Sequence, residues 1–282
     1  MRTELKAIRP EQLPAVLKVI NESSAGHSFQ FDLDLVKYLY LSRFWNFSYQ
    51  HSYLALAESV PAGVLLNCVD PSHNEAFSFY WGVLPEFRKR PLSMHLARTY
   101  LREVKELGFE KTYAISSIDS PLNLYYKLGF RPHQHLVELC SGKVDAVPGN
   151  GITNFTIATL LDELESFPPD PGSWITRATF LQHAAPFLEI LGIQQGERLV
   201  AWLALNRLSE GTTIVAFEFR PNAEDAARQL IAHLATRPAP VSASHVVKDS
   251  RADILLRQMG FMPHRERISL VLDLHTYLPS RK

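Results

Sequence analysis

The pentapeptide Gly-Phe-x-Pro-His occurs twice in this chain of 282 residues, at residues 129–133 and again at residues 260–264. The two copies are 131 residues apart (264 − 133 = 131), which is close to half the chain. A repeat at this spacing, in a chain long enough for two ordinary domains, predicts two copies of one domain. Residues 142–151, rich in Gly, Pro and Asn, predict a linker between domains at 1–141 and 152–282.

The composition is that of a globular protein, with 46% hydrophobic and 21% charged residues. Lys and Arg together number 29, as do Asp and Glu, so the charge balance favours neither nucleic acid nor membrane as a partner. Any anionic ligand must therefore be held by a local patch. The charged start of the chain does not resemble a signal peptide, and no apolar run is long enough to span a bilayer. We expect a cytoplasmic protein.

The cysteines and histidines do not suggest a metal site. Cys68 and Cys140 both lie in apolar, strand-like runs, so we expect them to be buried as small hydrophobic residues. No histidine, cysteine or carboxylate spacing corresponds to a metal-binding motif. His133 and His264 belong to the repeat, which favours a structural role for both.

The hydrophobic pattern predicts the same order of elements in both halves. In the first half it indicates strands at 3–8, 52–58, 62–69, 75–83, 111–116 and 135–140, and helices near 13–20, 33–44, 92–107 and 121–128. In the second half it indicates strands at 187–193, 199–205, 212–219, 241–247 and 268–274, and helices at 223–234 and before Gly260. The predicted fold class is α/β, or α+β with a mixed sheet: two tandem domains, each a mostly antiparallel sheet flanked by helices.

The segment from Val83 to Ser93 joins a predicted strand to a predicted helix and carries consecutive positive charges at Arg88, Lys89 and Arg90. A helix start offers free backbone N–H groups and the positive end of the helix dipole, which together suit a pyrophosphate. The alternative is an ordinary solvated basic turn before a helix.

Tyr125 lies in a predicted short helix, five residues before Phe130 of the repeat. A tyrosine that projects toward a cleft in the sheet can donate a proton to a leaving group. The alternative is a packing residue whose hydroxyl meets solvent.

These two segments, Val83-x-Pro85-x-x-Arg88 and Tyr125-x-Lys127-Leu128-Gly129-Phe130, resemble the GNAT superfamily of acyl-CoA N-acyltransferases. The resemblance covers most of residues 3–140. It implies two GNAT-like domains and acetyl-CoA as the co-substrate. It also implies that the strand end pairs with the pantetheine arm and that the loop cradles the pyrophosphate. The implied cofactor-binding residues are Gly82, Val83, Leu84, Arg88, Lys89, Arg90, Leu92, Ser93 and Asn123.

By the same resemblance, Tyr125 would protonate the departing thiolate of coenzyme A. Glu75 is the best acidic candidate for removing the proton of the amine, because strict alternation places it on one face with Phe77, Phe79 and Trp81. The alternative for Glu75 is a solvated charge at the start of a strand. The chain departs from the family pattern at Pro91, which replaces a glycine and offers no N–H. It also has Ile118 where the family often has asparagine.

The second half lacks the corresponding residues. Aligning Pro221 with Pro85 places Glu224 opposite Arg88, and the repeat offset places Leu256 opposite Tyr125. A carboxylate at a helix start repels a pyrophosphate. We therefore expect the second domain to be degenerate and to form one wall of the substrate cleft.

The sequence thus predicts an N-acetyltransferase that acts on a primary amine of a small molecule, amino acid or peptide. One alternative is a non-catalytic acyl-CoA-sensing or partner-binding protein with the same fold. Transfer from aminoacyl-tRNA is a third, disfavoured by the zero net charge. The sequence does not specify the acceptor or the oligomeric state.

Overall fold

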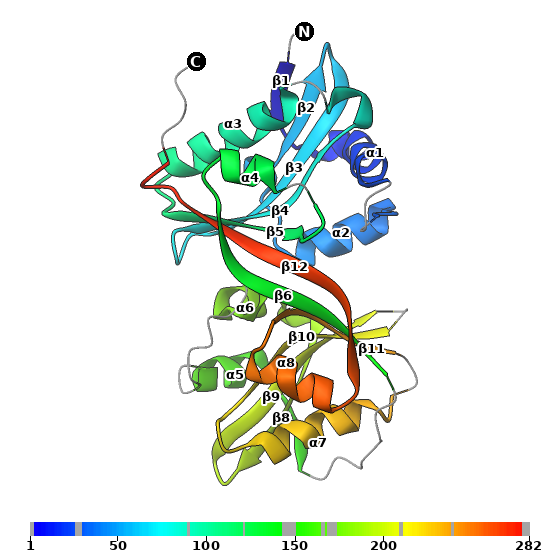
Figure 1. The fold of residues 1–282 in the computed structure, drawn as a ribbon, viewed down its shortest axis with the longest axis vertical. Helices are drawn as coiled ribbons and strands as arrows, with labels where there is room; N and C mark the ends of the chain where they lie inside the picture. The colour runs from blue at the N-terminus through cyan, green and yellow to red at the C-terminus, as the bar shows by residue number, and fades with distance from the viewer. Residues whose placement is uncertain are drawn as a thin grey trace. The chain divides into compact units, whose positions relative to one another are not determined.

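The computed structural model describes residues 3–25, 30–88, 91–120, 122–142, 151–164, 167, 174–208, 211–237 and 240–277. The chain forms two compact units (Figure 1). The first contains residues 1–133 together with 269–282, and the second contains residues 134–268. Each unit is described separately below.

The first unit is a mixed sheet with strand order β1-β2-β3-β4-β5-β12. Its strands are β1 (Thr3–Ala7), β2 (Tyr53–Ala57), β3 (Val60–Asp70), β4 (Glu75–Val83), β5 (Lys111–Ser117) and the end of β12 (Phe261–Asp273). Its helices are α1 (Leu13–Ser24), α2 (Leu35–Phe44), α3 (Leu92–Glu106) and α4 (Asn123–Lys127). Strands β1 to β4 pair antiparallel, whereas β4 and β5 pair parallel. The parallel pair is possible because α3 provides the crossover between them.

The helices cover both faces of this sheet, with α1 and α2 on one side and α3 and α4 on the other (Figure 1). Close contacts agree with this arrangement. A Cβ placed on Gly63 would approach Leu96 of α3, whereas one placed on Gly82 would approach Ser23 of α1. Gly82 pairs with Val64, the neighbour of Gly63, and successive residues of a strand point to opposite faces.

The second unit is a mixed sheet with strand order β12-β6-β11-β10-β9-β8-β7. Its strands are most of β6 (Arg131–Ser141), β7 (Ile152–Phe155), β8 (Leu188–Gln195), β9 (Arg198–Leu208), β10 (Gly211–Phe219), β11 (Val241–Val247) and the first part of β12. Its helices are α5 (Ile157–Leu164), α6 (Ala178–Ala184), α7 (Glu224–Leu234) and α8 (Arg251–Gln258). The pair β10–β11 is parallel, as β4–β5 is in the first unit.

The two sequence repeats share one order of elements, so the predicted fold class of two tandem mixed-sheet domains is confirmed. The repeated pentapeptide has the same structural task in both. Gly129 and Gly260 follow α4 and α8 with φ of 94° and 89°, a left-handed conformation that glycine adopts without strain and that often ends helices. The next residues, Phe130 and Phe261, are buried at 5% and 2% exposure and anchor the following strand in the core.

The compact units do not coincide with the sequence repeats, because each unit takes its last strand from the other repeat. Strand β6 belongs to the first repeat, yet its Leu139 packs in the apolar core of the second unit. The end of β12 belongs to the second repeat, yet residues from Ser269 onward lie in the first unit. The units therefore change at 133/134 and 268/269, whereas the sequence predicts a linker at 142–151. Of that linker, residues 143–150 lie outside the described part of the chain.

Most predicted elements are present, with ends shifted by a few residues. Strand β7 and helices α5 and α6 carry no clear pattern in the sequence and were not predicted. Cys68 is buried as expected, but Cys140 is exposed, so that expectation was wrong. Cys140 alternates with the buried Leu139 on β6, and the pleat turns it outward. None of the described helices is long and apolar enough to cross a membrane.

Candidate acyl-transfer site

A β-bulge interrupts β4 at Phe79. Asn67 of β3 pairs with Ser78, but the next pair is Leu66 with Tyr80, so Phe79 is the extra residue. A bulge changes which residues share a face, because alternation restarts after the inserted residue. Trp81 therefore lies on the face opposite to Glu75 and Phe77. The prediction that Trp81 shares a face with them was wrong.

The pairing between strands β4 and β5 ends just before the bulge. Their parallel pairing runs from Glu75 with Lys111 to Ser78 with Ala114, the last registered pair. Beyond that pair β4 continues to Val83 and β5 to Ser117. The diverging strand ends present backbone N–H and C=O groups that an extended ligand with amide groups can pair with. Gly82, Val83 and Leu84, predicted to contact the pantetheine arm, lie along this end of β4.

Helix α3 begins close to this strand end, after the turn formed by Pro85–Phe87. Pro91 is its N-cap residue, and the N–H of His95 is the first to bond back to Pro91, at 2.9 Å. The N–H groups of the three preceding residues therefore have no partner within the helix, and they point along its positive end. Leu92 is buried and anchors this turn, whereas Ser93 is partly exposed. Lys89 and Arg90 lie outside the described residues.

Arg88 does not simply extend into solvent as a phosphate ligand would. Its Nε donates to the carbonyl oxygen of Val83 at 3.1 Å, and its Nη2 donates to the carbonyl oxygen of Ser23 at 2.8 Å. The guanidinium therefore joins the end of β4 to the last turn of α1.

Tyr125 lies on α4, on the face of the sheet that carries Trp81. Its ring is perpendicular to the rings of Trp81 and Phe130, with centroid distances of 5.4 Å and 5.5 Å. Burial raises the pKa of Tyr125 to about 12. The phenol is therefore protonated at neutral pH and can act as a proton donor. Asn123, at the start of α4, is exposed.

Glu75 lies at the other end of β4. The residue is 9% exposed, and its carboxylate accepts a hydrogen bond from the hydroxyl of Tyr113 at 3.0 Å. Glu75 and Trp81 pair with Asp70 and Leu65 of β3, which are five positions apart, or roughly 17 Å along a strand. The structure therefore places Glu75 and Tyr125 far apart and on opposite faces. This geometry gives no support to Glu75 as the base.

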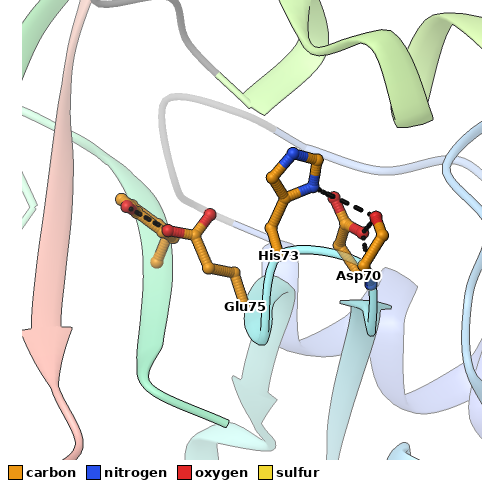
Figure 2. A network of polar contacts seen from close by, with 5 residues as sticks. Asp70, His73 and Glu75 are labelled. Carbon is orange, nitrogen blue, oxygen red and sulfur yellow. Dashed lines mark hydrogen bonds and ion pairs between the residues drawn. The ribbon is translucent and has the colours of Figure 1, made fainter.

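A separate set of polar contacts lies in the β3–β4 turn, just before Glu75. Nδ1 of His73 lies 2.8 Å from the Asp70 carboxylate, which also accepts the backbone N–H of Ser72 at 3.2 Å (Figure 2). The Glu75 carboxylate is directed away from this pair (Figure 2). Asp70 thus closes the turn, as an aspartate commonly does at such positions. Within the described ranges, no group of three His, Cys, Asp or Glu side chains could hold a metal ion.

The second unit keeps the backbone of this site but not its chemistry. Strand β10 also bulges, between Ile214 and Ala216, and its parallel pairing with β11 ends at Ile214 with Ala243. The guanidinium of Arg251, however, donates to the carbonyl oxygens of Phe219 and Arg220 at 3.2 Å and 2.9 Å. The carbonyl of Phe219 is thus bonded by an arginine of α8, whereas the corresponding carbonyl of Val83 is bonded by Arg88 of the segment that follows β4.

Two further differences separate the second unit from the first. Helix α7 begins with Glu224 and Asp225, which place negative charge where α3 has none in its first turn. Leu256, aligned with Tyr125, is fully buried. That the second domain is degenerate stays a prediction, and these features favour it.

Sequence reasoning missed the bulge and the contacts of Tyr80 and Ser23 at the end of β4. A weak signal was present, because a glycine inside a strand pattern, here Gly82, often marks a bulge or a close approach of other atoms. The contact of Trp81 with Tyr125 could not be predicted from the sequence, because it depends on the bulge at Phe79, which changes the face to which Trp81 points.

A bulged strand that diverges from its parallel neighbour beside a helix start, repeated in two halves, defines the tandem GNAT fold. The solved structures agree. A GCN5-related N-acetyltransferase from Sphaerobacter thermophilus aligns over 96% of this chain and 96% of its own, with a TM-score of 0.70 and 14% identity. A tandem GNAT protein from the clavulanic acid biosynthesis pathway aligns over 97% and 99%, with a TM-score of 0.69 and 10% identity. A putative acetyltransferase from Pyrococcus horikoshii aligns over 96% and 89%, with a TM-score of 0.69 and 10% identity.

At these identities the likeness establishes the fold. Neither a family model nor a curated protein matches the chain. Evidence for an activity therefore comes from the residues of the site.

Proposed function

We propose that the first unit binds an acyl-CoA, with acetyl-CoA as the expected form, and transfers the acyl group to a primary amine of a small molecule, amino acid or peptide. One observation carries the proposal: the end of β4 leads into the start of α3, and Trp81 of the same strand end contacts Tyr125. The strand end suits an amide-containing arm, the helix start suits a diphosphate, and the tyrosine suits a thiolate leaving group. No single ligand class other than an acyl-CoA requires all three.

The residues have the following proposed roles. Gly82, Val83 and Leu84 lie along the pantetheine arm, and Val83 offers its N–H, because the Val83 carbonyl accepts from Arg88 and the Leu84 N–H donates to the carbonyl oxygen of Ala62 at 2.9 Å. The first-turn N–H groups of α3, including those of Leu92 and Ser93, receive the diphosphate, and Lys89 and Arg90 of the preceding segment contribute positive charge. Pro91 contributes no N–H, so this cradle has one donor fewer than a glycine there would supply.

In the transfer step, a carbon–nitrogen bond forms between the acyl carbon and the amine, and the carbon–sulfur bond breaks. Tyr125 donates its proton to the departing sulfur, and the proton lost by the amine restores the phenol through solvent. The raised pKa of Tyr125 keeps the proton on the phenol at neutral pH, so it is available when negative charge develops on the sulfur. Holding both reactants side by side supplies much of the remaining rate enhancement.

Calorimetric titration with acetyl-CoA tests the binding site. Ser93→Glu places a carboxylate in the first turn of α3. The helix dipole stabilises a negative charge there, but the carboxylate repels a diphosphate. We expect a weakening of at least about tenfold, or about 1.4 kcal/mol. The matched control is Glu224→Ser, at the start of α7 in the second unit, which should leave the affinity unchanged. Equal effects of the two substitutions would refute the assignment to the first unit.

The rival function is an acyl-CoA sensor without turnover, which the missing N–H at Pro91 favours. The two functions differ in one measurement. Thiol release from acetyl-CoA in the presence of a panel of amines, compared between the wild type and Tyr125→Phe, reveals turnover that the substitution reduces. A protein that binds acetyl-CoA but releases no thiol with any amine would be a sensor.

A further inference from the structure

Arg88 connects two elements that lie far apart in the sequence. Val83, which receives one of its hydrogen bonds, is the last residue of β4, and Ser23, which receives the other, lies in the last turn of α1. The final carbonyls of a helix have no partner within it, and a cation there also suits the negative end of the dipole. One side chain thus satisfies two chain ends that would otherwise rely on solvent.

The same helix end contacts β4 through a second set of atoms. The hydroxyl oxygens of Ser23 and Tyr80 lie 2.8 Å apart, and the Tyr80 hydroxyl also donates to the carbonyl oxygen of Ile20 at 3.2 Å. Gly82 makes this approach possible. A Cβ at Gly82 would lie 2.4 Å from Oγ of Ser23 and 2.6 Å from the Tyr80 hydroxyl. The absence of a side chain at Gly82 therefore leaves room for the side chains of Ser23 and Tyr80 between α1 and β4.

Beside this junction, Phe31 packs against the bulge of β4. The ring of Phe31 meets the ring of Tyr80 edge-on at 5.2 Å, and its centroid is 6.4 Å from that of Phe79, the bulge residue. The backbone N–H of Phe31 donates to Oγ of Ser24 at 2.9 Å. Phe31, Phe79 and Tyr80 are only partly buried. They form an aromatic surface on the face of β4 opposite to Tyr125.

We propose that Arg88 is a positioning residue for the acceptor amine: by bonding the carbonyls of Ser23 and Val83, it holds the aromatic surface against the bulge of β4, where the amine approaches. The inference rests on the proposed function and deepens it. It also replaces the role that the sequence suggested for Arg88, that of a phosphate ligand. The surface fits an acceptor that carries a flat apolar group beside its amine, because aromatic rings contact such groups favourably.

The two roles for Arg88 predict different losses. A phosphate ligand affects the affinity for acetyl-CoA. A positioning residue affects the order of the end of α1 and the KM for the amine, and leaves acetyl-CoA binding nearly intact. The two bonds come from separate nitrogens of one planar fork, which lysine cannot reproduce with a single ammonium group. Lysine in place of Arg88 should therefore restore little, although it keeps the charge.

The experiment compares the wild type with Arg88→Lys, Arg88→Gln and the control Arg98→Gln, which changes an exposed arginine on α3. Hydrogen exchange is followed in residues 18–25 and 30–33, with acetyl-CoA affinity measured by calorimetry and the KM for the best amine in the panel. For both Arg88 variants we expect exchange in these residues to be about tenfold faster and KM for the amine to be about tenfold higher. The affinity for acetyl-CoA should change by less than about twofold.

A tenfold loss of acetyl-CoA affinity with unchanged exchange would overturn the inference and return Arg88 to the diphosphate site. Unchanged exchange in both variants would overturn it as well. A wild-type protein that fails to bind acetyl-CoA refutes the proposed function instead. The two failures are therefore read in different measurements.

Discussion

Each unit takes its last strand from the other sequence repeat, so we expect the last strand of the chain to stabilise the first unit. From Ser269 onward four large apolar side chains are buried in this part of the chain: Leu270, Leu272, Leu274 and Tyr277, at 0%, 3%, 1% and 7% exposure. Leu272 reaches Gly129, whose Cβ would lie 3.2 Å from its Cδ1, and the N–H of Leu274 donates to the carbonyl oxygen of Glu110 at 2.8 Å.

The magnitude follows from this burial. Each fully buried side chain of this size contributes about 1.5–3 kcal/mol, so the four together contribute about 6–12 kcal/mol. A domain has a total stability of only about 5–15 kcal/mol. Removal of residues 269–282 should therefore unfold the first unit, even though it removes nothing from the first repeat. The single substitution Leu272→Ala should cost about 2–5 kcal/mol, since it leaves a cavity in a packed core.

Urea unfolding measures the cost, and hydrogen exchange locates it. For Leu272→Ala we expect loss of protection in β4, β5 and α4, with β9 and β10 unchanged. Leu139→Ala is the reciprocal variant, because Leu139 packs in the core of the second unit, and it should expose β9 and β10 instead. The control Met262→Ala, at a side chain that is 65% exposed, should cost less than about 0.5 kcal/mol. If Leu272→Ala instead lowers protection in β9 and β10, the claim that the end of β12 belongs to the core of the first unit is refuted.

Three further predictions concern single side chains. Tyr125→Phe should lower kcat about 10²–10³-fold with little change in acetyl-CoA affinity, measured by thiol release; because burial raises the pKa of Tyr125 to about 12, this residue should cause no loss of rate between pH 7 and pH 10. Glu75→Gln should change kcat by less than about threefold, since Glu75 lies on the face opposite to Tyr125, and a loss of about 10²-fold would restore it as the base. Burial, with the charge of Arg267, lowers the pKa of His245 to about 3, so the unfolded chain binds the proton first as the pH falls below 6.5. Stability should therefore decrease between pH 6.5 and pH 3, by up to about 1.4 kcal/mol per pH unit, and urea titrations of His245→Asn should show a flatter dependence.

The sequence determined the architecture to a useful degree. The repeated pentapeptide, with a glycine that ends a helix and a phenylalanine that enters the core, predicted two copies of one domain. Apolar spacing predicted most strands and helices, because buried faces impose their own period on the chain. The run of charges before α3 and the position of Tyr125 also led to the proposal that the first half carries the site, since both are local properties of the chain.

Tertiary structure alone decided the rest. The bulge at Phe79 reverses the parity of β4, and so it brings Trp81 to Tyr125 and leaves Glu75 on the other face. Arg88 found carbonyl partners 5 and 65 residues away in the chain. Strand β12 completes the first unit, although its sequence belongs to the second repeat. These features depend on pairing between distant segments, and local residue patterns carry no information about which distant backbone group or strand edge a segment will meet.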